Sequence, residues 1–426
     1  MRTALIDSRA GRVVVALAVG LAVVGLATMI PTDAPLALGI GTVFLMLGII
    51  LAAPALLLAS VIACTYGVWR VGPGSLNMSI CDAVTVLAVL AALPYVPWRS
   101  RSLRRVLLGV AIYLMLVGVT LVAHHQHDAV FEYFHRFALA GGTCLIGAAI
   151  ARRGQTAISL KVFVLVGSFF AIAAIITSLQ NGLQPAYPFG IHKNFVGPMF
   201  AMTFLLLVVA PWKVGLRPSV VRHLRVLFVV ALLASQSRGA GLALVAVIAV
   251  YAMRHREAHR RAPLFFLTVS LVLIAVSTIT LNDEYRTNPK FNAIDTRSTG
   301  FSEAVNDVWL PSPLVGGGLR WFRATDATNA GVHNLAIAEL SENGLIGMLG
   351  FVILLGTIAM VLVHRRDPIG EAAFSIFLFE VLFAITEIFW VAGAVSFVML
   401  MVGIAVGEEP GPAPSPTAPK ALRALR

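Results

Sequence analysis

The sequence carries few charged residues. Asp, Glu, Lys and Arg together make up 12% of its 426 positions, whereas apolar residues make up 58%. Soluble domains contain about twice that share of charge, so the composition excludes an ordinary soluble protein. The net charge of +12 is divided among short clusters between apolar runs. This placement indicates membrane orientation rather than binding to nucleic acid.

Disulfide and metal-site patterns are also missing. The three cysteines, Cys64, Cys81 and Cys144, lie in apolar segments without paired spacing. We therefore expect buried thiols rather than a disulfide or a cysteine-based metal site. No Asp-x-Asp pair or His-x-x-x-His cluster lies in any loop that we expect outside the cytoplasm. The sequence therefore predicts no bound metal.

Long uncharged stretches are abundant. Many windows of about 18–25 residues lack any charge, which is enough for a helix to cross a hydrocarbon core of ~30 Å. Backbone in lipid must satisfy its own hydrogen bonds, and continuous apolar runs favour helices over a barrel. We predict an all-α, polytopic transmembrane helical bundle of about 12–14 spans, with weak boundaries near Pro54 and Phe389. The expected spans are 12–30, 35–52, 54–70, 76–97, 106–123, 130–150, 162–179, 195–211, 221–235, 239–253, 263–281, 335–363, 371–388 and 390–406.

The basic clusters define the expected topology. They lie near 98–105, 152–161, 213–225, 254–261 and 364–366, and each is separated from the next by two spans. The positive-inside rule makes these loops cytoplasmic, together with both chain ends. The basic N-terminus leads into the first span without a small-residue cleavage site, which predicts a retained anchor. The loops 124–128, 181–194, 235–239 and 282–334 then face the opposite side.

Three regions follow from this topology. Residues 1–407 form the transmembrane domain, and 408–426, rich in Pro, Ala and Ser, is predicted to be a disordered cytoplasmic tail. The loop 282–334 is inserted within the domain and is the one long hydrophilic stretch. Because it contains Trp309, Trp321 and two phenylalanines, we expect it to be partly folded.

His333 and Asn334 lie where the long loop meets an apolar helix. A histidine at this junction is held by a rigid element, remains accessible, and titrates in a range suited to proton transfer. The alternative interpretation is an interfacial histidine that caps the helix.

Two further segments place cations at the outer boundary. Arg238, in the run 235–240, could bind a phosphate in a bidentate manner or snorkel at a short hairpin. Lys193 and Asn194 precede a span and could bind an anionic group or simply anchor the loop.

The long loop and one late span add other candidates. Arg297 and Arg320 lie in the loop, where Gly316–Gly318 permit tight turns and could expose amides to an anion. Glu380 and Glu387, seven residues apart in the span 371–388, are functional candidates because ionisable groups at that depth are costly. They could orient His333, pair with an arginine, or lie protonated against lipid.

Taken in order, four segments resemble those of the O-antigen ligase/polymerase family of bacterial membrane proteins. The first two are 193–197 and 237–239. The third is Arg297 with Trp309 and Gly316–Gly318, which we call the glycine run, and the fourth is 333–334 with Glu342, Gly344 and Gly347. The similarity extends over roughly 160–390. It implies the membrane C-type glycosyltransferase architecture, a location in the bacterial inner membrane, and an active site that faces the periplasm.

The resemblance also implies a reaction. An inverting, metal-independent and cofactor-free enzyme would transfer a glycan from undecaprenyl pyrophosphate to a sugar hydroxyl of lipid A-core, completing lipopolysaccharide. His333 would be the general base, and Arg238 and Arg297 would contact the donor pyrophosphate with help from Lys193 or Arg320. Asn194, Asn334 and Glu387 would support the site. We expect these two lipids and the surrounding membrane lipids as partners, and no nucleic acid.

Other functions remain open at this point. Repeat-unit polymerases and protein O-oligosaccharyltransferases of the same family share these motifs; the modest chain length and short C-terminal tail favour a ligase. A lipid-linked glycan transporter would also need charges at membrane depth. Transporters commonly have two similar halves, and we find no internal repeat in this sequence.

Overall fold

The computed structural model describes residues 61–124 except 63, 69 and 72–77, and residues 127–255, 293–321, 332–387, 389–390 and 392–408. These residues are mainly helical, which confirms the all-α prediction for the described part. One antiparallel pair of two-residue strands, β1 (Arg70–Val71) and β2 (Met78–Ser79), accompanies the helices. The α-helices are α5 (Ile80–Ala92), α6 (Arg101–Ala123), α7 (His127–Phe137), α8 (Thr143–Arg152), α9 (Thr156–Gln180), α10 (Lys193–Val209), α11 (Pro218–Ser235), α12 (Arg238–Arg254), α14 (Ala293–Glu303), α16 (Leu335–Val363), α17 (Pro368–Ala384) and α18 (Ala394–Gly407). Shorter turns are the 3-10 helices η2 (Leu93–Tyr95), η4 (Pro188–Gly190) and η5 (Pro211–Val214), and the π-helices η3 (Ala138–Gly142) and η7 (Ala304–Trp309).

The predicted spans correspond closely to these helices. Every span expected within 76–253 and 335–406 contains a helix. Five segments are long and apolar enough to cross a membrane, which indicates a membrane-embedded protein: Arg101–Ala123, Asp128–Arg152, Thr156–Gln180, Pro218–Ser235 and Leu335–Val363. The expected spans 12–30, 35–52 and 263–281, most of 54–70, and the tail beyond 408 lie outside the described residues.

The helix α18 forms the centre of the bundle. All of its residues are buried, and it packs most extensively against α8 and then α17. A side chain on Gly147 of α8 would overlap the carbonyl of Leu400, and one on Gly403 would overlap the carbonyl of Cys144. Small residues that allow backbones to approach so closely are typical of helix packing in membranes. Cys81 and Cys144 are buried free thiols, as expected, and Cys64 is a partly buried one.

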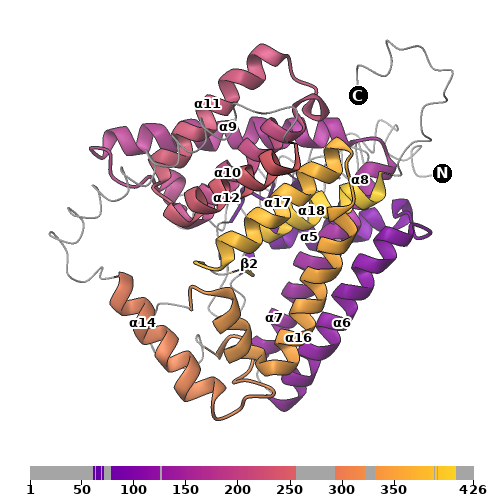
Figure 1. The fold of residues 1–426 in the computed structure, drawn as a ribbon, viewed down its shortest axis with the longest axis vertical. Coiled ribbons are helices and arrows are strands. Elements are labelled where there is room, and N and C mark those ends of the chain that lie inside the picture. The colour runs from indigo at the N-terminus through magenta and orange to yellow at the C-terminus, as the bar shows by residue number, and fades with distance from the viewer. Residues whose placement is uncertain are drawn as a thin grey trace, which may run out of the picture.

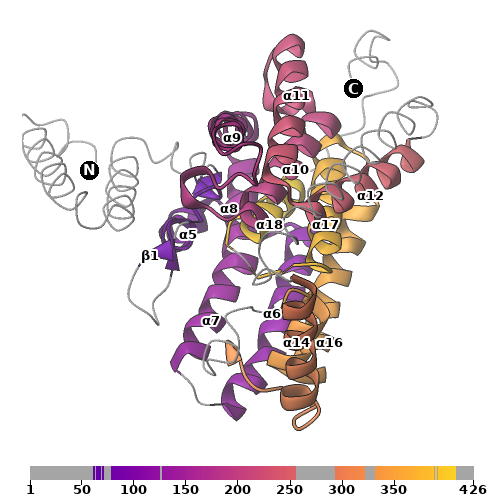
Figure 2. The same cartoon turned by 90° about the vertical axis from the view of Figure 1, so that its left-hand side faces the viewer.

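Most of the remaining helices form two groups around this centre. Figures 1 and 2 show α6, α7, α14 and α16 on one side of α17 and α18, while α9–α12 lie on the other side. The helix α16 packs along α6, and α10 packs on α11 and α17. The part of the long loop that the structure describes, 293–321, contacts α16 through η7. The described part of this loop contains α14 and η7.

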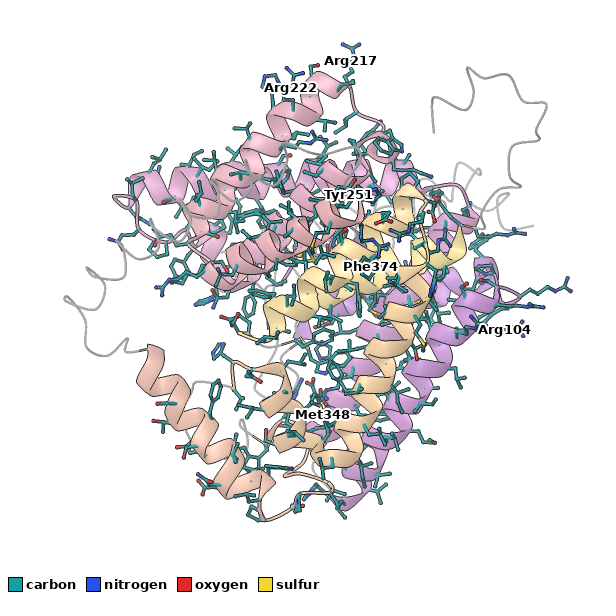
Figure 3. The ribbon with its side chains drawn as sticks, in the orientation of Figure 1. Arg104, Arg217, Arg222, Tyr251, Met348 and Phe374 are labelled. Carbon is teal, nitrogen blue, oxygen red and sulfur yellow. The ribbon has the colours of Figure 1, made fainter. Side chains whose placement is uncertain are left out.

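One end of the bundle is rich in basic residues. Arg254, at the end of α12, donates to the carbonyl of Val363 at the end of α16 and to the carboxylate of Glu371, both at 3.0 Å. Lys213, just after α10, pairs with Glu408 at 3.0 Å. The C-termini of α10, α12 and α16 thus lie beside basic groups. Figure 3 shows Arg104, Arg217 and Arg222 pointing outward from the bundle.

The helix α17 begins at this basic end with a side-chain cap. Asp367 accepts a hydrogen bond from the amide of Gly370 at 3.0 Å and pairs with Arg365 at 2.6 Å. Burial by itself would raise the pKa of Asp367, but the hydrogen bonds from Arg365 and Gly370 and the charge of Arg365 lower it below 3.8. The capping carboxylate is therefore ionised at neutral pH.

Candidate active site

Three predicted site residues meet at one carboxylate. His333 Nδ1 lies 2.7 Å from Glu387 Oε2, and Asn194 Nδ2 donates to Glu387 Oε1 at 2.7 Å. Asn194 lies more than a hundred residues from the other two, and His333 lies 54 residues before Glu387, so the fold brings them together. A carboxylate only accepts hydrogen bonds, so we assign the imidazole hydrogen to Nδ1. Nε2 of His333 then has a free lone pair, and the side chain is 27% exposed, which leaves it accessible to a substrate.

Helix N-termini hold two of these residues. Asn334 caps α16: its Oδ1 accepts from the amide of Ile337 at 3.1 Å, so the neighbouring His333 is fixed at the helix entrance. The Asn334 amide also donates to the carbonyl of Ile385 at 2.9 Å. Asn194 is the second residue of α10, whose N-cap is His192. The alternative interpretation, in which His333 caps the helix, is therefore wrong: Asn334 is the N-cap, and the side chain of His333 contacts Glu387.

Glu387 lies on the α17–α18 connector, which we define as residues 385–393. The sequence predicts a span over 371–388, but α17 ends at Ala384 and Glu387 is not helical, so this boundary is wrong by a few residues. The amide and hydroxyl of Thr386 both bond to the carbonyl of Phe383 at 3.0 Å, which ends the helix. Glu387 therefore does not share a helix with Glu380, as the predicted span implies, although both side chains line one cavity.

A cavity of about 60 Å³ lies beside His333 and Glu387. Its walls are mostly apolar with a few polar groups, a composition typical of binding sites. The lining residues are His192, Asn194, Phe195, Pro198, His333, Glu380, Phe383, Glu387, Ala392 and Ala394. Burial, with the nearby charge of Lys193, lowers the pKa of His192, so this histidine is neutral near pH 7.

The Arg238 turn packs against the same connector. The chain reverses between α11 and α12 at Gln236, which has a left-handed φ of 51°. A Cβ on Gly239 would lie 2.5 Å from the hydroxyl of Thr386, so only glycine fits this approach. Arg238 is exposed and makes no hydrogen bond or ion pair with the residues that the structure describes. It adjoins the site and keeps its guanidinium available for an anion.

The other three cations predicted to bind the donor differ from Arg238 in their position relative to the cavity. Lys193 is the first residue of α10 and is half-buried beside Asn194. Residue 297 lies in α14, but its side chain is outside the described part, so its contact with the donor stays a prediction. Arg320 is not brought to the cavity: its Nε donates to Glu132 at 2.7 Å, and its backbone amide donates to Glu342 at 3.2 Å.

The glycine run has a structural role. The helix α16 is interrupted at Gly344, with φ 60° and ψ −164°, which frees backbone groups on both sides of the break. Gly317 N donates to the carbonyl of Ser341 at 2.7 Å, and Gly318 N donates to that of Glu342 at 3.0 Å. The expectation that these amides bind an anion is therefore wrong, because the interrupted helix already uses them.

A buried ion network lies behind the site. Arg136 of α7, 3% exposed, donates to Glu339 at 2.8 Å and also pairs with Glu342 and Glu132. Arg320 joins it through Glu132. Removing one partner from such a network typically costs about 3–5 kcal/mol, because a charge is left buried and unpaired. The network fixes α7, α16 and the glycine-run loop relative to one another.

This network is connected to the catalytic candidates through Trp390. The indole Nε1 donates to Glu339 Oε1 at 2.5 Å, and the ring stacks on Tyr113 at 5.3 Å between centroids. The connector that carries Glu387 is thus held at Trp390 as well. Sequence reasoning missed Glu132 and Arg136, although both lie inside the predicted span 130–150, where an ionisable side chain indicates a functional role or a buried ion pair.

Within the described residues, no group of three or more His, Cys, Asp or Glu side chains is arranged to hold a metal ion. The chain matches no protein-family model and has no significant similarity to a curated protein.

Proposed function

We propose that the protein is a membrane-embedded glycosyltransferase that transfers a glycan from undecaprenyl pyrophosphate to a hydroxyl of lipid A-core. It would act as the O-antigen ligase that the sequence motifs resemble. The observation that carries the proposal is the meeting of His333, Glu387 and Asn194 beside a cavity. A base held by a carboxylate, with an accessible second nitrogen, suits the activation of a hydroxyl nucleophile.

The proposed reaction is a single displacement. The acceptor hydroxyl attacks the anomeric carbon and loses its proton to Nε2 of His333, while the bond between that carbon and the pyrophosphate oxygen breaks. The leaving group takes the electron pair as undecaprenyl pyrophosphate, and the anomeric configuration inverts. Glu387 stabilises the imidazolium that forms, because its carboxylate already accepts from Nδ1 at 2.7 Å.

Charge on the leaving pyrophosphate needs stabilisation. The N-termini of α10, α12 and α16 supply Asn194, Arg238 and His333 to this region. Helix N-termini carry partial positive charge and favour anions, so their convergence supports a bound diphosphate. The exposed guanidinium of Arg238 is the best-placed described cation for bidentate binding. We keep Arg297 as the second proposed pyrophosphate contact.

The distribution of charge supports a periplasmic site in an inner membrane. In α10, α12 and α16 the site residues lie at the N-terminal ends, while Lys213, Arg254 and Arg365 lie at or just beyond the C-terminal ends. The positive-inside rule assigns the basic end to the cytoplasm. The site then faces the opposite compartment, where a lipid-linked glycan donor and a lipid A-core acceptor would be available.

The test is reconstitution of the transfer. Purified protein in detergent is mixed with undecaprenyl-pyrophosphate-linked glycan and lipid A-core in the presence of EDTA. We expect a lipopolysaccharide ladder that disappears in His333→Ala, while that variant still inserts and unfolds at the wild-type temperature. Near-normal transfer by His333→Ala would remove the base assignment. Extension of the donor alone into longer lipid-linked chains would identify a repeat-unit polymerase instead.

A further inference from the structure

Glu380 is buried without a partner among the residues that the structure describes. It lies on α17 and is 1% exposed, yet neither carboxyl oxygen makes a hydrogen bond with the residues that the structure describes. Its side chain lines the cavity together with Glu387, His333 and, one turn along the same helix, Phe383. A buried carboxyl without a hydrogen-bond partner destabilises a fold, so its presence needs a reason outside the packing.

Glu380 has none of the three roles that the sequence suggests for it: orienting His333, pairing with an arginine, or lying protonated against lipid. It does not orient His333, whose Nδ1 is bonded to Glu387. It pairs with no arginine of the described helices: Arg136 and Arg254 contact other carboxylates, and the part-buried Arg225 of α11 donates to a backbone carbonyl. Because the residue is enclosed by protein, it does not face lipid. Its free hydrogen-bonding capacity is directed at the cavity.

We propose that this cavity is a subsite for a hydroxyl-bearing substituent of the reacting sugar, and that Glu380 is its hydrogen-bonding group. This inference rests on the proposed function. Sugar hydroxyls donate and accept, so they suit a carboxyl in either protonation state. The apolar remainder of the wall, which includes Phe195 and Phe383, would enclose the carbon that carries the hydroxyl.

The cavity, of about 60 Å³, has room for small polar groups. A hydroxymethyl or similar arm of a sugar fits such a space. The ring itself would lie at the mouth, beside Nε2 of His333, and its arm would displace the waters that otherwise solvate Glu380. The subsite therefore orients the sugar relative to the base.

The first test is binding, independent of catalysis. Thermal unfolding of the full-length protein in detergent is followed with and without the free glycan released from the donor, for wild type, Glu380→Leu and Glu380→Gln. The matched control is Glu371→Gln, a buried carboxylate nine residues earlier on α17 that pairs with Arg254, away from the cavity. We expect the glycan to raise the melting temperature of wild type, Glu380→Gln and the control, but not of Glu380→Leu. Without glycan, Glu380→Leu should melt higher than wild type, because the unpaired carboxyl is gone.

The second test is transfer. We expect Glu380→Leu to raise KM for one of the two sugar substrates at least tenfold, and Glu380→Gln to remain within about threefold of wild type. If Glu380→Leu keeps a wild-type KM, or if free glycan leaves wild-type melting unchanged, the subsite is overturned while the ligase proposal stands on its own assay. If wild type shows no transfer but binds glycan through Glu380, the ligase proposal fails and the subsite remains.

Discussion

The Glu387 carboxylate is the point where the proposed chemistry can be tested most sharply. It accepts one hydrogen bond from His333 and one from Asn194, both at 2.7 Å. Glu387→Gln preserves the shape of the side chain but directs an N–H₂ group at one of two donors, so one of these bonds is lost. A hydrogen bond to a charged group is worth about 1.5–3 kcal/mol. The bond to His333 strengthens as the imidazolium forms, so we expect transfer to slow by about 10- to 150-fold.

The assay is single-turnover transfer to lipid A-core with saturating donor, for wild type, Glu387→Gln, His333→Ala and the double variant. Because both residues act as one unit, the double variant should be no slower than His333→Ala alone. Glu371→Gln controls for loss of a buried carboxylate elsewhere. The reasoning is refuted if Glu387→Gln transfers within twofold of wild type, or if the two substitutions act additively.

Three further outcomes follow from the geometry. Gly344→Ala should lower the free energy of unfolding by about 3 kcal/mol, because φ 60° with ψ −164° is accessible only to glycine, whereas Gly356→Ala in open space on the same helix should not lower it. Comparison of their melting temperatures checks this. Trp390→Phe removes the N–H that bonds to Glu339 but keeps an aromatic ring at this position. Transfer should therefore slow about tenfold, with KM for the lipid-linked glycan unchanged in steady-state kinetics. Asp367→Ala should cost about 1 kcal/mol of stability at pH 7 through loss of the cap. Since the pKa of Asp367 is lowered in the fold, chemical denaturation should show a constant deficit from pH 8 to pH 5 that shrinks as pH falls below 3.8.

The helical architecture was readable from the sequence because hydropathy is a local property. A run such as 106–123 forms a helix in any apolar environment that leaves its backbone no other partner, and α6 spans Arg101–Ala123. The turn at 235–239 was predicted for the same local reason. The end of α17 was placed too late because Ile385 and Phe389 are as apolar as the helix before them. The side-chain cap from Thr386, which ends the helix, has no hydropathy signal.

Single residues of the site could be chosen from the sequence by their chemistry and position. His333 and Asn334 stand at a helix entrance, and an acid such as Glu387 is conspicuous among apolar residues. Their meeting with Asn194 was decided by tertiary structure alone. Local patterns carry no information on which of many helix ends converge.

Tertiary structure likewise decided what the sequence left open or placed wrongly. The sequence gives no reason to prefer Arg238 over Arg320 as an anion-binding residue, but the guanidinium of Arg320 forms an ion pair with the buried carboxylate of Glu132 on α7. The glycine-run amides have the composition of an anion-binding turn, yet the break in α16 at Gly344 presents carbonyls that they must satisfy. Glu380 differs from the other buried acids only in what surrounds it. Its burial in the cavity beside His333, without a partner among the described residues, depends on the packing of α17 against its neighbours, which only the folded chain reveals.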